Sequence, residues 1–127
     1  MVDSKRYLDW YAAGRKDLAA AHILKDQGGD HALVCFHCQQ AIEKHLKGFI
    51  LHRAQRLTEG HGLLMLCKAC ASFEEGFLRF LKDVALVSVY YAETRYPADQ
   101  PLEVSDEDTE ECLTIAELLI AFVEGKS

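Results

Sequence analysis

The feature that most constrains this fold is the spacing of the apolar residues, which recur at steps of three and four along most of the sequence. This is the period of a helix with one buried face. Residues 5–27 show it first, followed by Gly28 and Gly29, which favour a helix end. The stripe in this segment is formed by Tyr7, Tyr11, Gly14, Leu18 and Ala21. The pattern predicts an all-α fold.

A longer helix is predicted to follow, with Asp30 as its N-cap and its end near Ala54. Its apolar residues cover most of its girth, so we expect it to be the central helix of the fold. Residues 55–61 form a polar connection. The segment from Gly62 to Ala71 is then predicted to be a short apolar helix.

Two further helices complete the predicted fold. Ser72-Phe73-Glu74-Glu75 matches the S-x-x-E capping box and predicts a fourth helical stretch that runs to Tyr91 or Thr94. Pro97 disfavours the α conformation in the residue before it and ends this stretch. Ser105 begins the last helix, with acids in its first turn. Residues 1–127 are therefore expected to form one domain, an up-and-down bundle of about five helices.

Composition and charge narrow the class of protein. Half of the 127 residues are hydrophobic, enough for a core without disulfides or metal. Charged residues at the N-terminus replace the apolar run of a signal peptide, and no membrane span is predicted, so we expect a cytoplasmic protein.

The net charge is −6, with six acids between residues 103 and 111. Lys44, Lys47, Arg53 and Arg56 form a basic stretch that either faces an anion or lies on a solvated helix face.

Four of the five cysteines form a C-x2-C…C-x2-C pattern, at positions 35, 38, 67 and 70. This spacing is typical of zinc sites. Both pairs, however, lie inside apolar helical runs, where residues i and i+3 point to the same side of the core. We therefore predict buried thiols and no metal site. Phosphate-binding loops and catalytic motifs of the common kinds are also absent from the sequence, so no cofactor is predicted.

Three segments together resemble the HEPN family. Residues 36–47 read F-H-C-Q-Q-A-I-E-K-H-L-K, residues 60–64 read G-H-G-L-L, and residues 91–97 read Y-A-E-T-R-Y-P. In that family the corresponding segments commonly read F-H-x-Q-Q-A-x-E-K-x-L-K, T-H-x-L and x-x-R-Y-P. The resemblance spans most of the chain, from about residue 10 to residue 123.

The resemblance implies a helical bundle that pairs into a homodimer and is often encoded beside a minimal nucleotidyltransferase as a toxin–antitoxin module. Members are viewed as nucleotide-binding partners or as metal-independent ribonucleases. The ribonuclease branch uses an R-x4-6-H motif near the later helices. No histidine follows His61, so Arg95 lacks such a partner. Arg56 to His61 and Arg15 to His22 have the spacing but lie outside the usual place of the motif.

The predicted ligand-binding residues lie in two segments. His37, Gln40, Lys44 and Lys47 form a polar ribbon along one side of the central helix. Arg95 and Tyr96 hold a guanidinium and an aromatic ring at a fixed corner before Pro97. Both groups suit a phosphate or a base edge, and we expect them to meet in one cleft.

A structural interpretation stands beside this one. Glu43 and Lys47 would brace an exposed helix face, while His37 and Gln40 satisfy backbone groups at a dimer seam. Arg95 would pair with an acid such as Glu43, and Tyr96 would pack against the bundle.

The sequence thus favours a dimeric nucleotide- or RNA-binding protein that acts with a minimal nucleotidyltransferase. It carries no motif that reads DNA sequence. The first alternative is a metal-independent endoribonuclease toxin, with His61 as general base and Arg56 or Arg95 stabilising the charged transition state. The second alternative is a structural dimerisation module.

Overall fold

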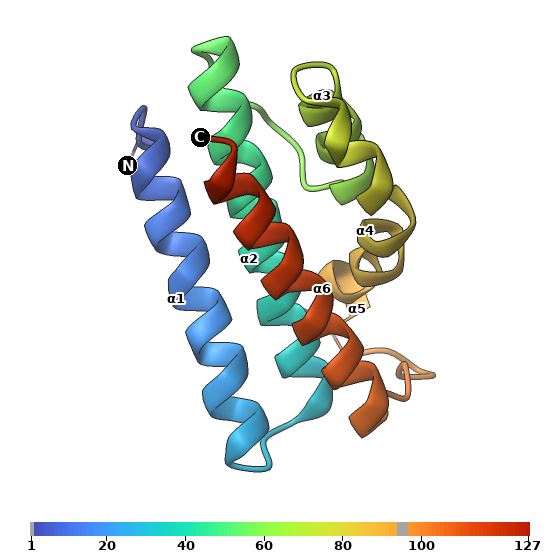
Figure 1. The fold of residues 1–127 in the computed structure, drawn as a ribbon. Helices are drawn as coiled ribbons and strands as arrows, with labels where there is room; N and C mark the ends of the chain where they lie inside the picture. The colour runs from blue at the N-terminus through green and yellow to red at the C-terminus, as the bar shows by residue number, and fades with distance from the viewer. Residues whose placement is uncertain (1, 94–96) are drawn as a thin grey trace.

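Three long helices form one part of the molecule, and shorter helical segments pack against their side (Figure 1). The computed structural model describes residues 2–93 and 97–127, except for the side chains of residues 92 and 93. The elements are α1 (Tyr7–Asp26), α2 (His31–Ala54), α3 (Leu63–Ala71), the 3-10 helix η1 (Glu75–Phe80), α4 (Leu81–Ser88), α5 (Tyr90–Glu93) and α6 (Asp106–Gly125). The described residues contain no strand, which confirms the all-α prediction. None of the described helices is long and apolar enough to span a membrane.

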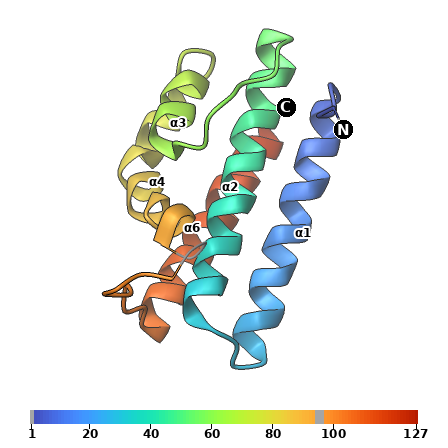
Figure 2. The same ribbon diagram turned by 180° about the vertical axis from the view of Figure 1, so that it is seen from behind.

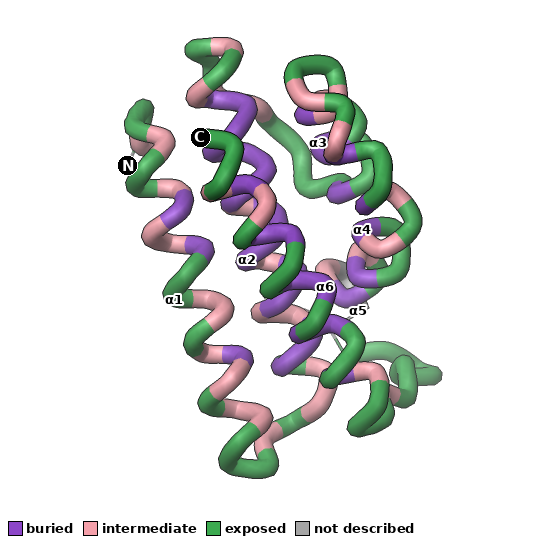
Figure 3. The backbone as a smooth tube through the Cα atoms, viewed as in Figure 1, coloured by how far each residue is buried: buried purple, intermediate pink, exposed green. Residues whose placement is uncertain are grey.

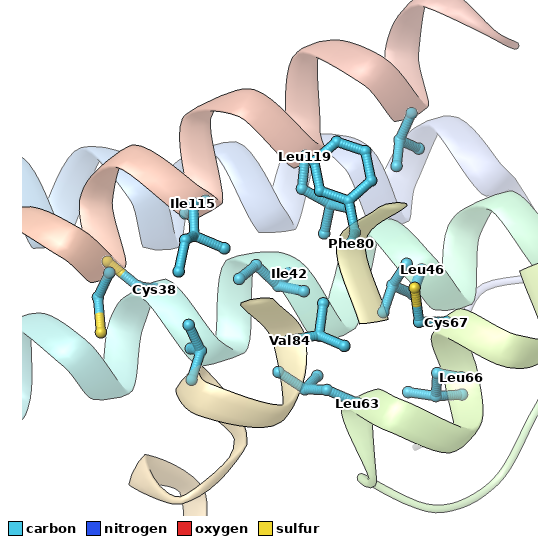
Figure 4. Close-up of a cluster of buried hydrophobic side chains, with 14 of the residues drawn as sticks. Cys38, Ile42, Leu46, Leu63, Leu66, Cys67, Phe80, Val84, Ile115 and Leu119 are labelled. Atoms are coloured by element: carbon cyan, nitrogen blue, oxygen red, sulfur yellow. The ribbon is translucent and has the colours of Figure 1, made fainter. Parts of the chain in front are cut away.

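Helix α2 is the central element, as its apolar girth predicted. It packs against α1, α6 and α3, and its apolar side chains from Val34 to Ile50 are almost fully buried, except for the half-buried Phe36. Figure 3 shows buried residues along α2 and along the facing side of α6. In the close-up of Figure 4, Ile42 and Leu46 lie among side chains from α3, α4 and α6. Seen from behind, the side of α2 between α1 and the shorter helices has no described helix over it (Figure 2).

The contact between α1 and α2 depends on two glycines. A Cβ on Gly14 would lie 2.3 Å from Nδ1 of His45, and one on Gly48 would lie 2.7 Å from the Tyr11 ring. His45 is fully buried, with Nδ1 2.9 Å from the Ala41 carbonyl oxygen and Nε2 2.9 Å from a carboxylate oxygen of Glu124 on α6. The missing side chains of the glycines therefore let the two helices approach closely enough to enclose this imidazole.

The helix starts agree with the predicted caps in two places. The Asp30 carboxylate accepts a hydrogen bond from the backbone N–H of Leu33, at 3.0 Å. Ser105 and Asp108 form a reciprocal capping box at the start of α6. These side chains satisfy backbone N–H groups that a helix leaves without partners in its first turn.

The predicted capping box at Ser72 is wrong. Ser72 has helical dihedral angles rather than the extended conformation of an N-cap, because its backbone N–H bonds back to Lys68 and Ala69 at the end of α3. Its hydroxyl donates to the Ala69 carbonyl, and Glu74 caps η1 instead. The expected fourth helix is accordingly divided into η1, α4 and α5.

We expect the substitution Gly14→Ala to destabilise the protein by about 1–3 kcal/mol, because the new methyl group would overlap a buried ring held by two hydrogen bonds. The helix propensity gain, about 1 kcal/mol, is too small to offset this overlap. Urea unfolding measures the difference. Gly125→Ala is the matched control, since nothing lies within 4 Å of a Cβ at that position. Equal stabilities of the two variants would contradict the packing described for His45.

Candidate functional site

The carboxylate of Glu43 is the centre of a polar cluster on α2. Glu43 is only 5% exposed, and its two oxygens accept two hydrogen bonds and form one ion pair. Oε2 accepts a hydrogen bond from His61 Nδ1 at 2.8 Å and lies 3.1 Å from Lys47 Nζ in an ion pair, and Oε1 accepts from Gln39 Nε2 at 3.2 Å. A buried carboxylate is costly unless it is paired in this way. The three donors thus keep a negative charge beneath the protein surface.

His61 connects this cluster to solvent. It lies just before α3, between Gly60, whose φ of 92° is left-handed, and Gly62, the N-cap of α3. Its side chain is 52% exposed, and its ring stacks on Tyr91 of α5 with the ring centres 4.6 Å apart. Because Nδ1 donates to Glu43, Nε2 of the neutral ring is the nitrogen that can accept a proton. A carboxylate thus orients an accessible imidazole base.

A groove of about 310 Å³ runs beside His61 and Lys47. Trp10 of α1 forms part of its wall, and the loop before α3 supplies most of the rest. Its lining residues are Asp3, Trp10, Lys47, Leu57, Thr58, Glu59, Gly60 and His61. The Thr58 hydroxyl oxygen is buried and has no hydrogen-bond partner in the described part of the chain. Buried polar atoms are nearly always paired, so this hydroxyl is an exception among the described residues.

The structure divides the predicted polar ribbon into two groups. Lys47 belongs to the Glu43 cluster, and Gln40 joins it by donating to Gln39 Oε1 at 2.7 Å. His37 and Lys44 instead contact Asp17 of α1, with His37 Nδ1 2.9 Å from a carboxylate oxygen. Lys47 and His61 therefore share one groove, whereas His37 and Lys44 link α2 to α1.

These contacts correct two interpretations of the basic stretch. Lys44 and Lys47 neither lie on a solvated face nor stand free for an anion, because Asp17 and Glu43 pair with them. The pair of Glu43 and Lys47 does form, but both side chains are more than nine-tenths buried, so it does not brace an exposed face. Asp17 was missed because it comes from another helix.

Of the two arginines predicted to act at the site, Arg56 and Arg95, only Arg56 lies in the described part of the chain, and it does not line the groove of His61. Arg56 is exposed and lines a neighbouring groove with Lys5 and Gln55, not the groove of His61. Arg95 and Tyr96 lie outside the described residues. Tyr91, four residues before Arg95, does reach His61. The other pair with the R-x4-6-H spacing, Arg15 and His22, also lies away from the groove of His61.

Both members of that second pair bind acids of α6. Arg15 donates to Glu124 at 2.9 Å, and His22 lies 2.6 Å from Glu117. Their role in the structure is thus to join α1 to α6.

The two C-x2-C pairs lie apart. Cys38 lies at one end of the close-up in Figure 4, and Cys67 lies at the other. Cys70 donates to the Leu46 carbonyl, about two turns beyond Cys38 along α2. All five thiols are free and buried, and the described residues contain no group of three or more metal ligands.

The sequence matches the HEPN domain family over residues 7–126. The chain belongs to the HEPN family. Two solved structures are similar to this HEPN chain along almost its whole length. One is TT1696 from Thermus thermophilus, with a TM-score of 0.82 and 32% identity over 98% of this chain and 100% of that one. The other is ST0689, an archaeal HEPN homologue, with a TM-score of 0.77 and 25% identity over 97% and 98%. No curated protein matches the sequence.

The family segments meet at the Glu43 cluster of this HEPN chain. The first segment supplies Gln39, Glu43 and Lys47 from α2, the second supplies His61, and the third begins with Tyr91. Sequence reasoning named Lys47 and His61 but missed the central role of Glu43. The i, i+4, i+8 spacing of Gln39, Glu43 and Lys47 was the signal that placed them on one face.

We expect none of the five cysteines to react with Ellman's reagent in the folded protein at about pH 8, where a free thiol is partly ionised. Burial raises the pKa of Cys38 to about 12 and that of Cys67 to about 11, so these thiols stay protonated. The hydrogen bond with Cys112 lowers the pKa of Cys35, and this thiol is kept from the reagent by its burial alone. All five should react once the protein is unfolded in guanidinium chloride. A thiol that reacts within seconds under native conditions would contradict this burial.

Proposed function

We propose that this HEPN chain binds a nucleotide or RNA in the groove beside Lys47 and His61. The observation that carries the proposal is the Glu43 cluster, which holds an imidazole at the edge of a groove that also contains the unpaired Thr58 hydroxyl. Imidazole, hydroxyl and indole groups are the chemistry that pairs with and stacks on a nucleotide.

The burial of the cluster supports a role beyond packing. Replacing a buried ion pair by apolar residues is often neutral or stabilising, so packing alone does not require Glu43 and Lys47 at this place. The buried hydroxyl of Thr58 likewise has no partner within the described part of the chain. Both features agree better with a ligand site.

The biological setting of the proposal comes from the family. We propose that the chain works in the cytoplasm as a homodimer beside a minimal nucleotidyltransferase, in a toxin–antitoxin module. The resemblance of the three segments to the HEPN family supports this setting. Sedimentation of the purified protein tests the dimer, and co-purification of the neighbouring gene product tests the partner.

A second candidate function is metal-independent RNA cleavage, and the bond from His61 to Glu43 favours it. His61 Nε2 would remove the proton of a ribose 2′-hydroxyl, whose oxygen then attacks the adjacent phosphorus. The 5′-oxygen leaves and takes a proton from water, which gives a 2′,3′-cyclic phosphate and a 5′-hydroxyl. In this reaction Glu43 is a positioning residue, and Arg56 or Arg95 would stabilise the charged transition state.

The substitution Thr58→Val separates binding from stability. We expect it to raise the stability by up to about 1 kcal/mol, because it removes a buried hydroxyl without a partner. We also expect it to weaken binding of single-stranded RNA or a nucleoside monophosphate by roughly threefold or more, because the ligand loses a hydrogen bond. Urea unfolding and fluorescence anisotropy measure the two effects. Unchanged binding of every ligand that the wild type binds would remove the support that Thr58 gives to the site.

The substitution His61→Ala tests which of the two functions applies. If the chain cleaves RNA, the variant should lose at least about 100-fold in rate in the presence of EDTA, because the general base is gone. If the chain only binds, the intact protein leaves RNA uncut, and nucleotides raise its melting temperature. His22→Ala is the matched control, because that histidine is exposed and pairs with α6. Absence of both cleavage and ligand stabilisation would leave the structural module.

A further inference from the structure

Two further grooves lie next to the groove of His61 and share lining residues in sequence. The first neighbour, of about 350 Å³, is lined by Lys5, Leu51, Gln55, Arg56 and Leu57, and it shares Leu57 with the His61 groove. The next, of about 280 Å³, shares Lys5, Leu51 and Gln55 with it and adds Arg6, Tyr7, Leu8 and His52. Figures 1 and 2 show the N-terminal segment and the end of α2 at the same end of the molecule. We call these two neighbouring grooves the basic track.

The charges along the basic track differ from those at the Glu43 cluster. Lys5, Arg6 and Arg56 line it, and no carboxylate does so in the described part of the chain. Among the described residues, none of these three cations forms an ion pair, in contrast to Lys44 and Lys47. Unpaired cations that line a groove attract the phosphates of a nucleic acid chain.

The backbone at this end of the molecule agrees with that charge. Arg6 is the N-cap of α1, so the positive end of α1 lies at this end of the molecule, where Asp9 in the first turn partly offsets it. The negative end of α2 is partly neutralised, because Gln55 donates its backbone N–H to the Leu51 carbonyl and its side-chain amide to the His52 carbonyl. The helix ends therefore do not oppose an anion on the track, and the attraction comes from the three cations.

The His61 groove has the opposite preference. Asp3 and Glu59 line it together with Lys47, whose charge Glu43 already balances. A phosphate in this groove would face two carboxylates, whereas the hydroxyls of a ribose can donate to them. Trp10 offers an indole in the same wall for a base. The groove thus suits the nucleoside part of a nucleotide, with its phosphates outside.

We infer that the protein binds single-stranded RNA, with one nucleoside in the His61 groove and the adjoining phosphates along the basic track. The inference rests on the proposed function and sharpens its ligand from any nucleotide to an RNA strand. It also assigns Arg56 to binding of the RNA backbone. A mononucleotide would fill only the groove of His61 and leave the track empty.

The test compares two triple variants that remove the same charge. The track variant carries Lys5→Gln, Arg6→Gln and Arg56→Gln, and the control variant carries Lys16→Gln, Lys68→Gln and Lys82→Gln, which are exposed and lie off the track. The probes are a fluorescein-labelled RNA of mixed sequence, about 12 nucleotides long to span one binding site, and unlabelled AMP. Anisotropy at a series of salt concentrations gives the RNA affinity, and calorimetry gives the AMP affinity.

We expect the track variant to bind the RNA roughly tenfold or more weakly than the control variant at about 50 mM salt. The slope of log affinity against log salt should fall by about 2, because three phosphate contacts on a single strand account for about 0.7 each. AMP affinity should change less than about twofold, since the His61 groove is intact. DNA of the same sequence should bind more weakly than RNA, because it lacks the 2′-hydroxyl.

Several results would overturn the inference. Equal RNA affinities and salt slopes for the two variants would show that RNA does not bind along the basic track. Wild-type protein that binds AMP as tightly as RNA would also show that the track adds nothing to binding. Equal affinity for DNA would remove the choice of RNA. The proposed function fails separately, if wild-type protein binds neither RNA nor AMP, and it survives if Thr58→Val weakens AMP binding while the track variant behaves like the control.

Discussion

The rest of the site depends on one buried negative charge, the Glu43 carboxylate. Two hydrogen bonds and one ion pair hold it under the surface. Gln39 and Lys47 come from the preceding and following turns of α2, and His61 comes from the loop before α3. The carboxylate thereby fixes which nitrogen of His61 carries the proton and ties the loop to the central helix. Without this charge, Lys47 would be a buried cation without a partner, and neither residue would have a set position at the groove.

The pairing of acids and bases also divides the cations of the molecule into two classes. Those on α2 that drew attention in the sequence, Lys44 and Lys47, are used inside the protein by Asp17 and Glu43. Those near the N-terminus and the end of α2, Lys5, Arg6 and Arg56, form no ion pair in the described part of the chain. A net charge of −6 therefore coexists with a local basic surface, since most of the surplus acids lie near the start of α6.

Prediction from the sequence was most reliable for features that depend on neighbours along the chain. Asp30 and Ser105 cap their helices because the groups they bond lie three residues away. Ser72 fulfils the same sequence rule but does not cap a helix. Its backbone N–H instead donates to the Lys68 and Ala69 carbonyls at the end of α3. Prediction of the site residues also depended on whether their contacts are local in the sequence. Lys47 and His61 were named as candidates from the sequence, whereas the contacts of Lys44 with Asp17 and of His61 with Tyr91 join segments far apart in the sequence.

The sequence by itself determined the helical class, the central place of α2 and the family to which the chain belongs, because periodicity and motif spacing are local properties of the chain. Only the tertiary structure decided which cations are neutralised, which histidine nitrogen is basic and which grooves join. The physical reason is that a charge has no fixed role until its partners are known. Those partners come from other helices, placed by the burial of apolar side chains and by the close approach at Gly14 and Gly48.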